Sequence, residues 1–247
     1  MGRTGEGILP ICRINRIPQQ ISETHEHPAR LDRSRYGLRW RHSRCSPCTI
    51  CKKITAVDFS ENMLSIVRSR CEEKGITNVS TIHGRWEDDW VSLGIGQYDI
   101  AIASRSLIGD NTQSLIEKLN NVASRQVYIS VASGDGPADL RLLEAAGRSF
   151  PMGHDYIWYC NLLYDMGIRA QVAFIREDHP NVWDSHEAAF EEQLWMFRDR
   201  DITEEEESVR SYLKEHLSLI GGRWQLPYER RWYWAVMWWT KKGGGEK

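Results

Sequence analysis

The sequence after residue 53 predicts an α/β fold, a three-layer sandwich with helices on both faces of a mostly parallel sheet. Short β-branched and apolar runs alternate there with amphipathic segments, and strands separated by helical patterns of roughly 10–15 residues are typical of parallel βαβ units. The composition, with 41% hydrophobic and 27% charged residues, is that of a globular protein and excludes a fully disordered chain. No run approaches the ~18 apolar residues of a membrane span, so we expect no membrane partner.

The first 53 residues differ from the rest in charge and in pattern. They carry 11 Lys and Arg against 4 Asp and Glu, whereas the remaining 194 residues carry 21 against 30. Half of the eight prolines lie in this segment, which has no sustained helical or strand period. We therefore expect residues 1–53 to be irregular, residues 54–242 to form the folded domain, and residues 243–247 to be a disordered tail.

The first half of the folded domain contains four predicted strands and two predicted helices. Ser60 is a typical N-cap for the first helix, and Gly75 is a typical stop for it. The second helix has apolar residues at helical spacing along one face. The predicted strands are residues 54–58, 79–83, 98–104 and 127–132, and the predicted helices are residues 60–74 and 112–122.

The second half has more helix. The predicted helices are residues 138–146, 155–166, 186–198 and 204–217, and the predicted strands are residues 169–175 and 230–240. Two helices lie between the last two strands, so residues 178–222 are predicted to be a helical insertion. The tryptophans that alternate along the last strand indicate sheet packing, with an aromatic acceptor pocket or a homodimer surface as alternatives.

The most informative motif is ITAVDFSENML, residues 54–64. It places the carboxylate of Asp58 where a strand ends and a helix begins, which is the edge of a parallel sheet where ligands bind. A carboxylate accepts two hydrogen bonds, so Asp58 could hold a ribose diol while Phe59 and Met63 flank an adenine ring. The alternative is that Asp58 only caps the helix that begins near Ser60.

This motif resembles the second strand of the class I S-adenosylmethionine-dependent methyltransferases. The family has V-x-A-V-D followed by x-S-x-x-M-L, and Asp58, Ser60, Met63 and Leu64 match it. The resemblance implies a Rossmann-like sheet of seven strands in the order 3-2-1-4-5-7-6, with residues 230–240 as its one antiparallel strand. It also implies S-adenosylmethionine as the cofactor and methyl transfer as the activity.

Later segments follow the same family in order. HGRWEDD, residues 83–89, stands where the family contacts adenine, although Arg85 replaces the usual acid and Trp86 could offer a backbone N–H and a stacking face. QYDIAIASRSL, residues 97–107, resembles the fourth strand, with Ser104 and Arg105 at the cofactor-facing end. The implied cofactor-binding residues are Asp58, Phe59, Ser60, Met63, Arg85, Trp86, Ser104 and Arg105.

The family's glycine-rich loop, V-L-D-x-G-x-G-x-G, is missing from its place before Asp58. The stretch there has a single glycine, Gly37. When its codons are read one base later, the single codon of Trp40 forces a glycine, and the flanking codons permit T-V-L-D-M-G-C-G-G-G-T-L-A-V-P-L-A. The hypothesis is that residues 1 to about 51 are a frameshifted reading of a methyltransferase N-terminus, with the lost or gained base near Lys52 and Lys53.

A metal site is the rival interpretation of this segment. Cys45, Cys48 and Cys51 have two-residue spacing, and three histidines precede them, which would be enough ligands for zinc. The arginines of the segment could likewise form a nucleic-acid arm. Since a frameshift accounts for both features, we predict no metal site and consider nucleic acid an unlikely partner.

The sequence gives weaker evidence for the residues that would contact the methyl acceptor. His154 and Tyr156 open a predicted helix and could contact an acceptor, although capping by Asp155 explains the pattern equally well, and Trp183 could cover a substrate. The acidic runs of the insertion favour a small-molecule acceptor over a nucleic acid. Methyl transfer depends mainly on alignment of acceptor, methyl and sulfur, so no catalytic residue is predicted.

Two other functions compete with a methyltransferase. With half a cofactor site, the chain could be a non-catalytic binding protein, and a strand-end acid such as Asp58 also serves nucleotide-binding dehydrogenases. The chain shows no apolar segment of a secretory signal and has only six cysteines, so a cytoplasmic location is expected.

Overall fold

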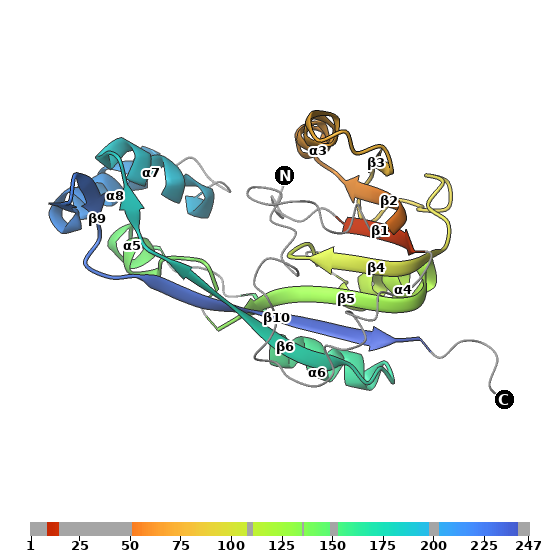
Figure 1. Cartoon of the computed structure of the whole chain (residues 1–247). Coiled ribbons are helices and arrows are strands. Elements are labelled where there is room, and N and C mark those ends of the chain that lie inside the picture. The colour runs from red at the N-terminus through yellow and green to blue at the C-terminus, as the bar shows by residue number, and fades with distance from the viewer. Residues whose placement is uncertain are drawn as a thin grey trace. The chain divides into compact units, whose positions relative to one another are not determined.

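The computed structural model describes residues 9–14, 51–107, 111–134, 136–148, 153–197 and 203–241. Figure 1 shows the chain with its elements labelled. Cys45, Cys48 and the histidines of the predicted metal alternative lie outside the described residues, as does the segment of the missing glycine loop. The described chain divides into two compact units. The sheet unit comprises the described parts of 5–131, 158–175 and 235–247, and the helical unit those of 132–157 and 176–234.

A seven-stranded sheet has the order β3-β2-β1-β4-β5-β10-β6. Its strands are β1 (Leu9–Ile14), β2 (Cys51–Asp58), β3 (Val79–His83), β4 (Tyr98–Ser104), β5 (Ala123–Ser133), β6 (Gln171–His179) and β10 (Arg230–Thr240). The predicted strand 98–104 has the bounds of β4, whereas β2 begins three residues before the predicted start of the folded domain.

The direction of β1 corrects two expectations. β1 runs antiparallel to both of its neighbours, β2 and β4, so β10 is not the one antiparallel strand that was expected. It also lies within the first 50 residues, which were expected to be irregular. The physical reason is that the facing edges of β2 and β4 present backbone N–H and C=O groups that need partners. The apolar segment LPICRI of β1 supplies them.

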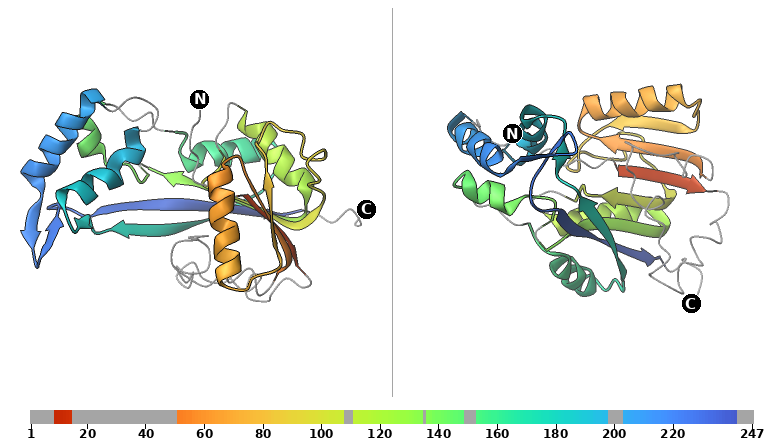
Figure 2. Two further views of the ribbon diagram at one scale, coloured as in Figure 1. Left: turned by 90° about the horizontal axis from the view of Figure 1, so that it is seen from above. Right: turned by 60° about the vertical axis from the view of Figure 1, so that its left-hand side comes forward.

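The helices of the sheet unit follow their strands as predicted. Ser60 caps α3 (Glu61–Glu73), and the buried side chains of Val67 and Cys71 pack against Ala56 of β2. Figure 2 shows α3, drawn in orange, lying beside the strands that flank it in the sequence. α4 (Thr112–Val122) has the predicted bounds and buries a stripe of apolar residues. An amphipathic stripe of this kind favours a helix that lies on a sheet face.

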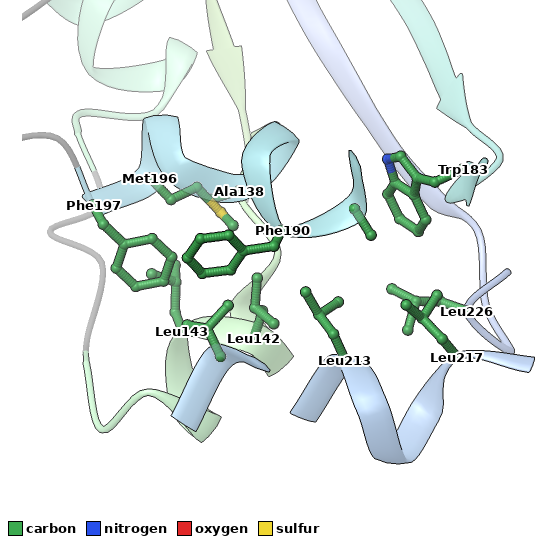
Figure 3. Close-up of a cluster of buried hydrophobic side chains, with 12 residues drawn as sticks. Ala138, Leu142, Leu143, Trp183, Phe190, Met196, Phe197, Leu213, Leu217 and Leu226 are labelled. Carbon is green, nitrogen blue, oxygen red and sulfur yellow. The ribbon is translucent and has the colours of Figure 1, made fainter. Parts of the chain in front are cut away.

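The helical unit has its own apolar core. It contains α5 (Leu140–Ala145), α7 (His186–Gln193), η3 (Leu194–Phe197) and α8 (Thr203–His216). Figure 3 shows Leu142, Phe190 and Leu213 from three of these helices pointing toward one another, and all are buried. Burial of such side chains contributes roughly 1.5–3 kcal/mol each.

A second sheet also lies in this unit, with three strands in the order β7-β9-β8. These strands are β7 (Val182–Trp183), β8 (Ser218–Ile220) and β9 (Arg223–Gln225). The sequence analysis did not predict this sheet. Elsewhere, α6 (Tyr156–Asp165) lies within the predicted helix 155–166. No helix of the described residues is long and apolar enough to cross a membrane.

Candidate functional site

The candidate site lies at the carboxyl edge of the parallel strands in the sheet unit. β1 is antiparallel to both β2 and β4, so these two strands are parallel to each other. Ile11 of β1 is level with Thr55 on one side and with Ala101 on the other. Three residues further on, Asp58 and Ser104 are therefore also level, at two strand spacings or roughly 10 Å.

The neighbouring strands β3 and β5 bring two more side chains to the level of Asp58 and Ser104. Asp58 is paired with His83 of β3, and Ser104 with Ser130 of β5. The hydroxyls of Ser104 and Ser130 are 3.0 Å apart and share a hydrogen bond. Because carboxyl ends of parallel strands form ligand-binding edges, the structure brings the predicted residues of β2 and β4 together where such a site is expected.

Asp58 is buried, with an exposed fraction of 5%. Its Oδ1 accepts a hydrogen bond of 2.7 Å from the backbone N–H of Ser60, while Oδ2 has no hydrogen bond to the described residues. Burial raises the pKa of Asp58, and the Ser60 N–H and the nearby His83 act in the opposite direction. The cap of α3 is made by the Ser60 hydroxyl, which accepts from the N–H of Met63 at 3.4 Å, so capping does not require Asp58.

The loop after β3 is tied down by its own polar groups. Arg85 donates its backbone N–H to Asp88 at 2.8 Å and accepts the indole N–H of Trp90 at 3.0 Å. Trp86 stacks on Trp90 with ring centroids 5.3 Å apart. Lys118 of α4 donates to the carbonyls of Trp86 and Asp88. These contacts fix the loop in place beside the carboxyl edge of the sheet.

Two predicted adenine neighbours lie in this loop with different surroundings. The side chain of Arg85 is exposed. Trp86 is half-buried, and its indole N–H is already donated to the carbonyl of Ser106 at 2.7 Å. Trp86 can thus offer an aromatic face, but its indole N–H is not available to a ligand.

The chain beyond β4 turns sharply at the edge. Arg105 has a φ of 58°, which is unusual for a residue other than glycine. Its N–H is donated to the carbonyl of Ser130 at 3.0 Å. The following residue, Ser106, is buried, and its hydroxyl has no hydrogen-bond partner among the described residues. Sequence reasoning missed Ser106, because only the loop geometry distinguishes it from an ordinary loop serine.

The predicted acceptor residues, His154, Tyr156 and Trp183, belong to the helical unit. Trp183 has an exposed fraction of 4%, and its indole N–H is donated to Glu192 at 2.7 Å. Asp155 accepts the N–H of Tyr156, the next residue, whereas an N-cap side chain accepts from the second or third residue of its helix. Roles for these three residues in substrate binding stay predictions.

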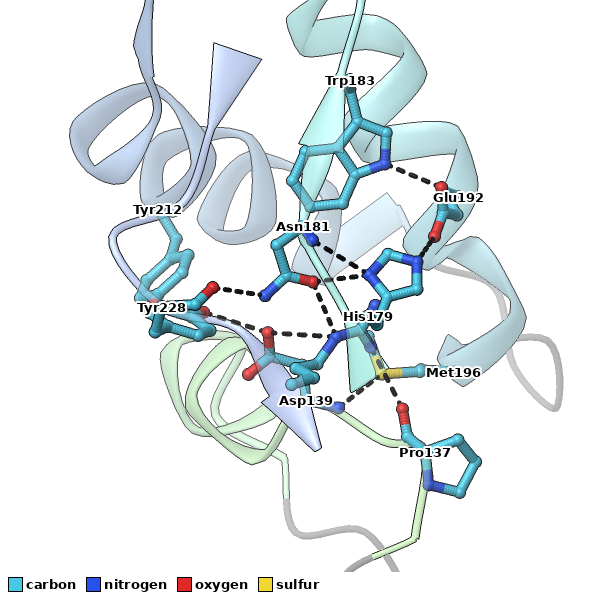
Figure 4. Close-up of polar contacts among 10 residues, drawn as sticks. Pro137, Asp139, His179, Asn181, Trp183, Glu192, Met196, Tyr212 and Tyr228 are labelled. Atoms are coloured by element: carbon cyan, nitrogen blue, oxygen red, sulfur yellow. Dashed lines mark hydrogen bonds and ion pairs between the residues drawn. The ribbon is translucent and has the colours of Figure 1, made fainter. Parts of the chain in front are cut away.

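The helical unit also holds a polar network that the sequence analysis did not predict (Figure 4). Asp139, with an exposed fraction of 4%, accepts the phenolic O–H of Tyr228 at 3.0 Å. Arg230 donates to Asn181 at 2.9 Å and to the carbonyl of Pro137 at 3.1 Å. Burial raises the pKa of Tyr228 and lowers that of Arg230.

His179 continues the network toward α7. Its Nε2 lies 2.7 Å from Glu192 Oε1, and this contact lowers the pKa of Glu192. Its Nδ1 lies 2.9 Å from Asn181 Oδ1. Both ring nitrogens therefore have partners within the unit. Among the described residues, no group of three or more His, Cys, Asp or Glu side chains could hold a metal ion.

Comparisons with known proteins show the fold of the chain. No family model matches it. A Haemophilus influenzae protein named only as uncharacterized is 31% identical over 125 residues, which cover 51% of this chain and 46% of that protein. The matched stretch thus spans about half the length of that curated relative.

Two solved structures share the fold. A candidate methyltransferase from Bacillus halodurans has a TM-score of 0.52 at 16% identity, covering 79% of this chain and 85% of its own. The YcgJ protein from Bacillus subtilis has a TM-score of 0.51 at 12% identity, covering 80% and 86%. The chain therefore has a mixed α/β fold like that of these two proteins.

Proposed function

We propose that the chain is an enzyme that transfers a methyl group from S-adenosylmethionine to a small-molecule acceptor. The observation that carries the proposal is the position of Asp58. Its carboxylate ends β2 at the edge where open α/β sheets bind ligands, and its Oδ2 has no hydrogen bond to the described residues. The fold shared with the Bacillus halodurans protein is consistent with this function.

The described residues fit the adenosine half of the cofactor. Asp58 would hold the ribose diol, because a carboxylate accepts two hydrogen bonds. Phe59, Met63 and the face of Trp86 would border the adenine, with Ser60 holding the turn into α3. Bound S-adenosylmethionine would supply an electrophilic methyl group, and the chain would mainly orient the acceptor toward it and exclude water.

The methionine half has no holder of the expected kind among the described residues. Ser104 and Arg105 would face this half. The place between β2 and β4, where the resemblance implies a glycine-rich loop, holds the amino-terminal end of β1, since Leu9 pairs with Val57. We propose that residues 1 to about 51 are read in a shifted frame and that the restored frame supplies the loop. Resequencing the codons for His25 to Val57 tests this, because a one-base difference near the lysine codons is expected.

The net charge of the chain after residue 53 is the reason for proposing a small-molecule acceptor. The chain after residue 53 carries an excess of nine acidic residues, and a nucleic-acid substrate would require basic surface. His154, Tyr156 and Trp183 are the proposed acceptor contacts, and a cytoplasmic location and a homodimer on the tryptophan-rich strand remain parts of the same proposal.

Equilibrium dialysis with S-adenosylhomocysteine tests the cofactor site. Asp58→Asn is expected to weaken binding about tenfold or more, since it removes charge-assisted hydrogen bonds. Glu72→Gln, on the exposed side of α3, is the matched control and should bind like the unchanged chain. Binding that does not depend on Asp58 would overturn the proposed site. No binding at all would favour a non-catalytic protein.

A further inference from the structure

The hydroxyl of Ser106 is the unexplained polar group of the candidate site. Ser106 has an exposed fraction of 6%, and in the part of the chain that the structure describes its buried Oγ has no hydrogen-bond partner. Native proteins pair nearly all buried polar groups, so each exception requires a reason. A group that is paired only when a ligand is bound is one such reason.

The backbone around this hydroxyl is fixed from two sides. The carbonyl of Ser106 accepts the indole N–H of Trp86 at 2.7 Å. The preceding residue, Arg105, has a φ of 58° and donates its N–H to Ser130. The position of the hydroxyl is therefore set by its neighbours and not by a bond of its own.

The side chains near Ser106 offer few hydrogen-bond acceptors to a ligand. The resemblance implies an acid at position 85, but Arg85 stands there, and a guanidinium only donates. One oxygen of the Asp88 carboxylate is occupied by the N–H of Arg85 at 2.8 Å. The indole N–H of Trp86 is a donor and is already used. Ser106 differs from Asp88 in that its oxygen is buried and unpaired among the described residues, so it is the group that gains most from a donor on a ligand.

We infer that the Ser106 hydroxyl accepts a hydrogen bond from the exocyclic amino group of an adenine bound at this edge. The inference rests on the proposed function and names the residue that recognises the base. Ser106 does the work that an acid at position 85 would otherwise do. Because its Oγ is covered in the structure, the base must displace part of the surrounding chain in order to reach it.

The test compares two nucleosides with two proteins. Adenosine carries the 6-amino group, and purine riboside lacks it. The unchanged chain should bind adenosine about fivefold more tightly than purine riboside, as one hydrogen bond provides, and Ser106→Ala should bind the two equally. Ser92→Ala removes a hydroxyl that bonds Asp89 on the exposed part of the loop and should keep the fivefold ratio.

The outcomes separate this inference from the proposed function. If the unchanged chain binds S-adenosylhomocysteine and Ser106→Ala keeps the fivefold ratio, only the role of Ser106 is overturned. If the unchanged chain binds neither S-adenosylhomocysteine nor adenosine, the proposed function and this inference both fail.

Thermal unfolding without ligand gives a second readout. Ser106→Ala should leave the Tm unchanged or raise it slightly, because the hydroxyl has no partner to lose. A fall of several degrees would mean that the hydroxyl is bonded inside the ligand-free protein, and the assignment to a ligand would be wrong.

Discussion

Two polar clusters of the molecule differ in how their buried groups are satisfied. Around Asp139 in the helical unit, the carboxylate accepts from Tyr228, and Arg230 donates to Asn181 and to a backbone carbonyl. At the carboxyl edge of the sheet unit, Asp58 and Ser106 each keep an oxygen without a hydrogen bond to the described residues. Groups that bond one another stabilise a fold, whereas groups left over are available to a ligand.

The comparison predicts where a substitution costs stability and where it costs binding. One residue of the helical unit, Gln193, does not follow this division between paired and unpaired buried groups. Gln193 has an exposed fraction of 1%, and neither the oxygen nor the nitrogen of its amide has a hydrogen-bond partner among the described residues. It ends α7, where Ala189 and Phe190 are also buried, so it is a further place to test how much an unpaired buried group costs.

The largest effect is expected for Asp139→Ala. This change removes the carboxylate that accepts from Tyr228 and lies 4.0 Å from the buried guanidinium of Arg230, and breaking such a buried pair costs about 3–5 kcal/mol. Urea unfolding measures the change in free energy. Asp184→Ala, which breaks the exposed ion pair with Arg223, is the control and should cost about 1 kcal/mol or less. Equal losses in the two variants would contradict a structural role for the network.

The second substitution, Gln193→Met, is expected to raise the stability of the folded chain. Gln193→Met keeps the shape of the side chain and removes the unpaired amide, so the chain should gain about 1–2 kcal/mol in urea unfolding. Gln171→Met, on the exposed start of β6, should change stability by less than about 0.5 kcal/mol. A loss of stability in Gln193→Met would show that the amide has a partner, such as a buried water.

A smaller loss is expected at the start of α3. Ser60→Ala removes the hydroxyl that accepts the N–H of Met63, and loss of an N-cap costs about 1 kcal/mol. Ser65→Ala, on the exposed face of the same helix, is the control and should be neutral or slightly stabilising. Urea unfolding of both variants separates capping from helix propensity. If Ser60→Ala were neutral, the turn would be held by Asp58 alone.

The smallest effect concerns pH. The pKa of Asp58 is raised in the folded chain by burial. The folded state therefore binds this proton more readily than the unfolded state, and the stability from Asp58 is lost as pH rises through the folded pKa. Asp58→Asn lacks this dependence. In urea unfolding, the variant should gain stability relative to the unchanged chain as the pH rises above the unfolded-state pKa of about 3.9, and a relative loss would contradict the effect of burial on Asp58.

Helices and strands with a long apolar period could be predicted from the sequence. Elements that form only through contacts with residues far away in the sequence could not. β4 and α4 have the predicted bounds because their apolar patterns extend over 7 and 11 residues. β7, with two residues, is too short for any period. β1 could not be predicted because its six residues, LPICRI, include a proline and show no strict alternation of apolar and polar residues.

The same division applies to the candidate site. Asp58 was predicted because the acid directly follows an apolar strand. The network around Asp139 was missed because Tyr228 is 89 residues away in the sequence. The hydroxyl of Ser106 gains its meaning from the burial of its oxygen and from its neighbour Trp86, and neither is visible in a sequence pattern.

A crystal structure of the chain with S-adenosylhomocysteine tests the central claim most directly. The account predicts both ribose hydroxyls within about 2.5–3.0 Å of the Asp58 carboxylate, the usual range for such hydrogen bonds. It also predicts the adenine beside Trp86 and Ser106. A ligand bound elsewhere, or at this edge with its ribose away from Asp58, would contradict it.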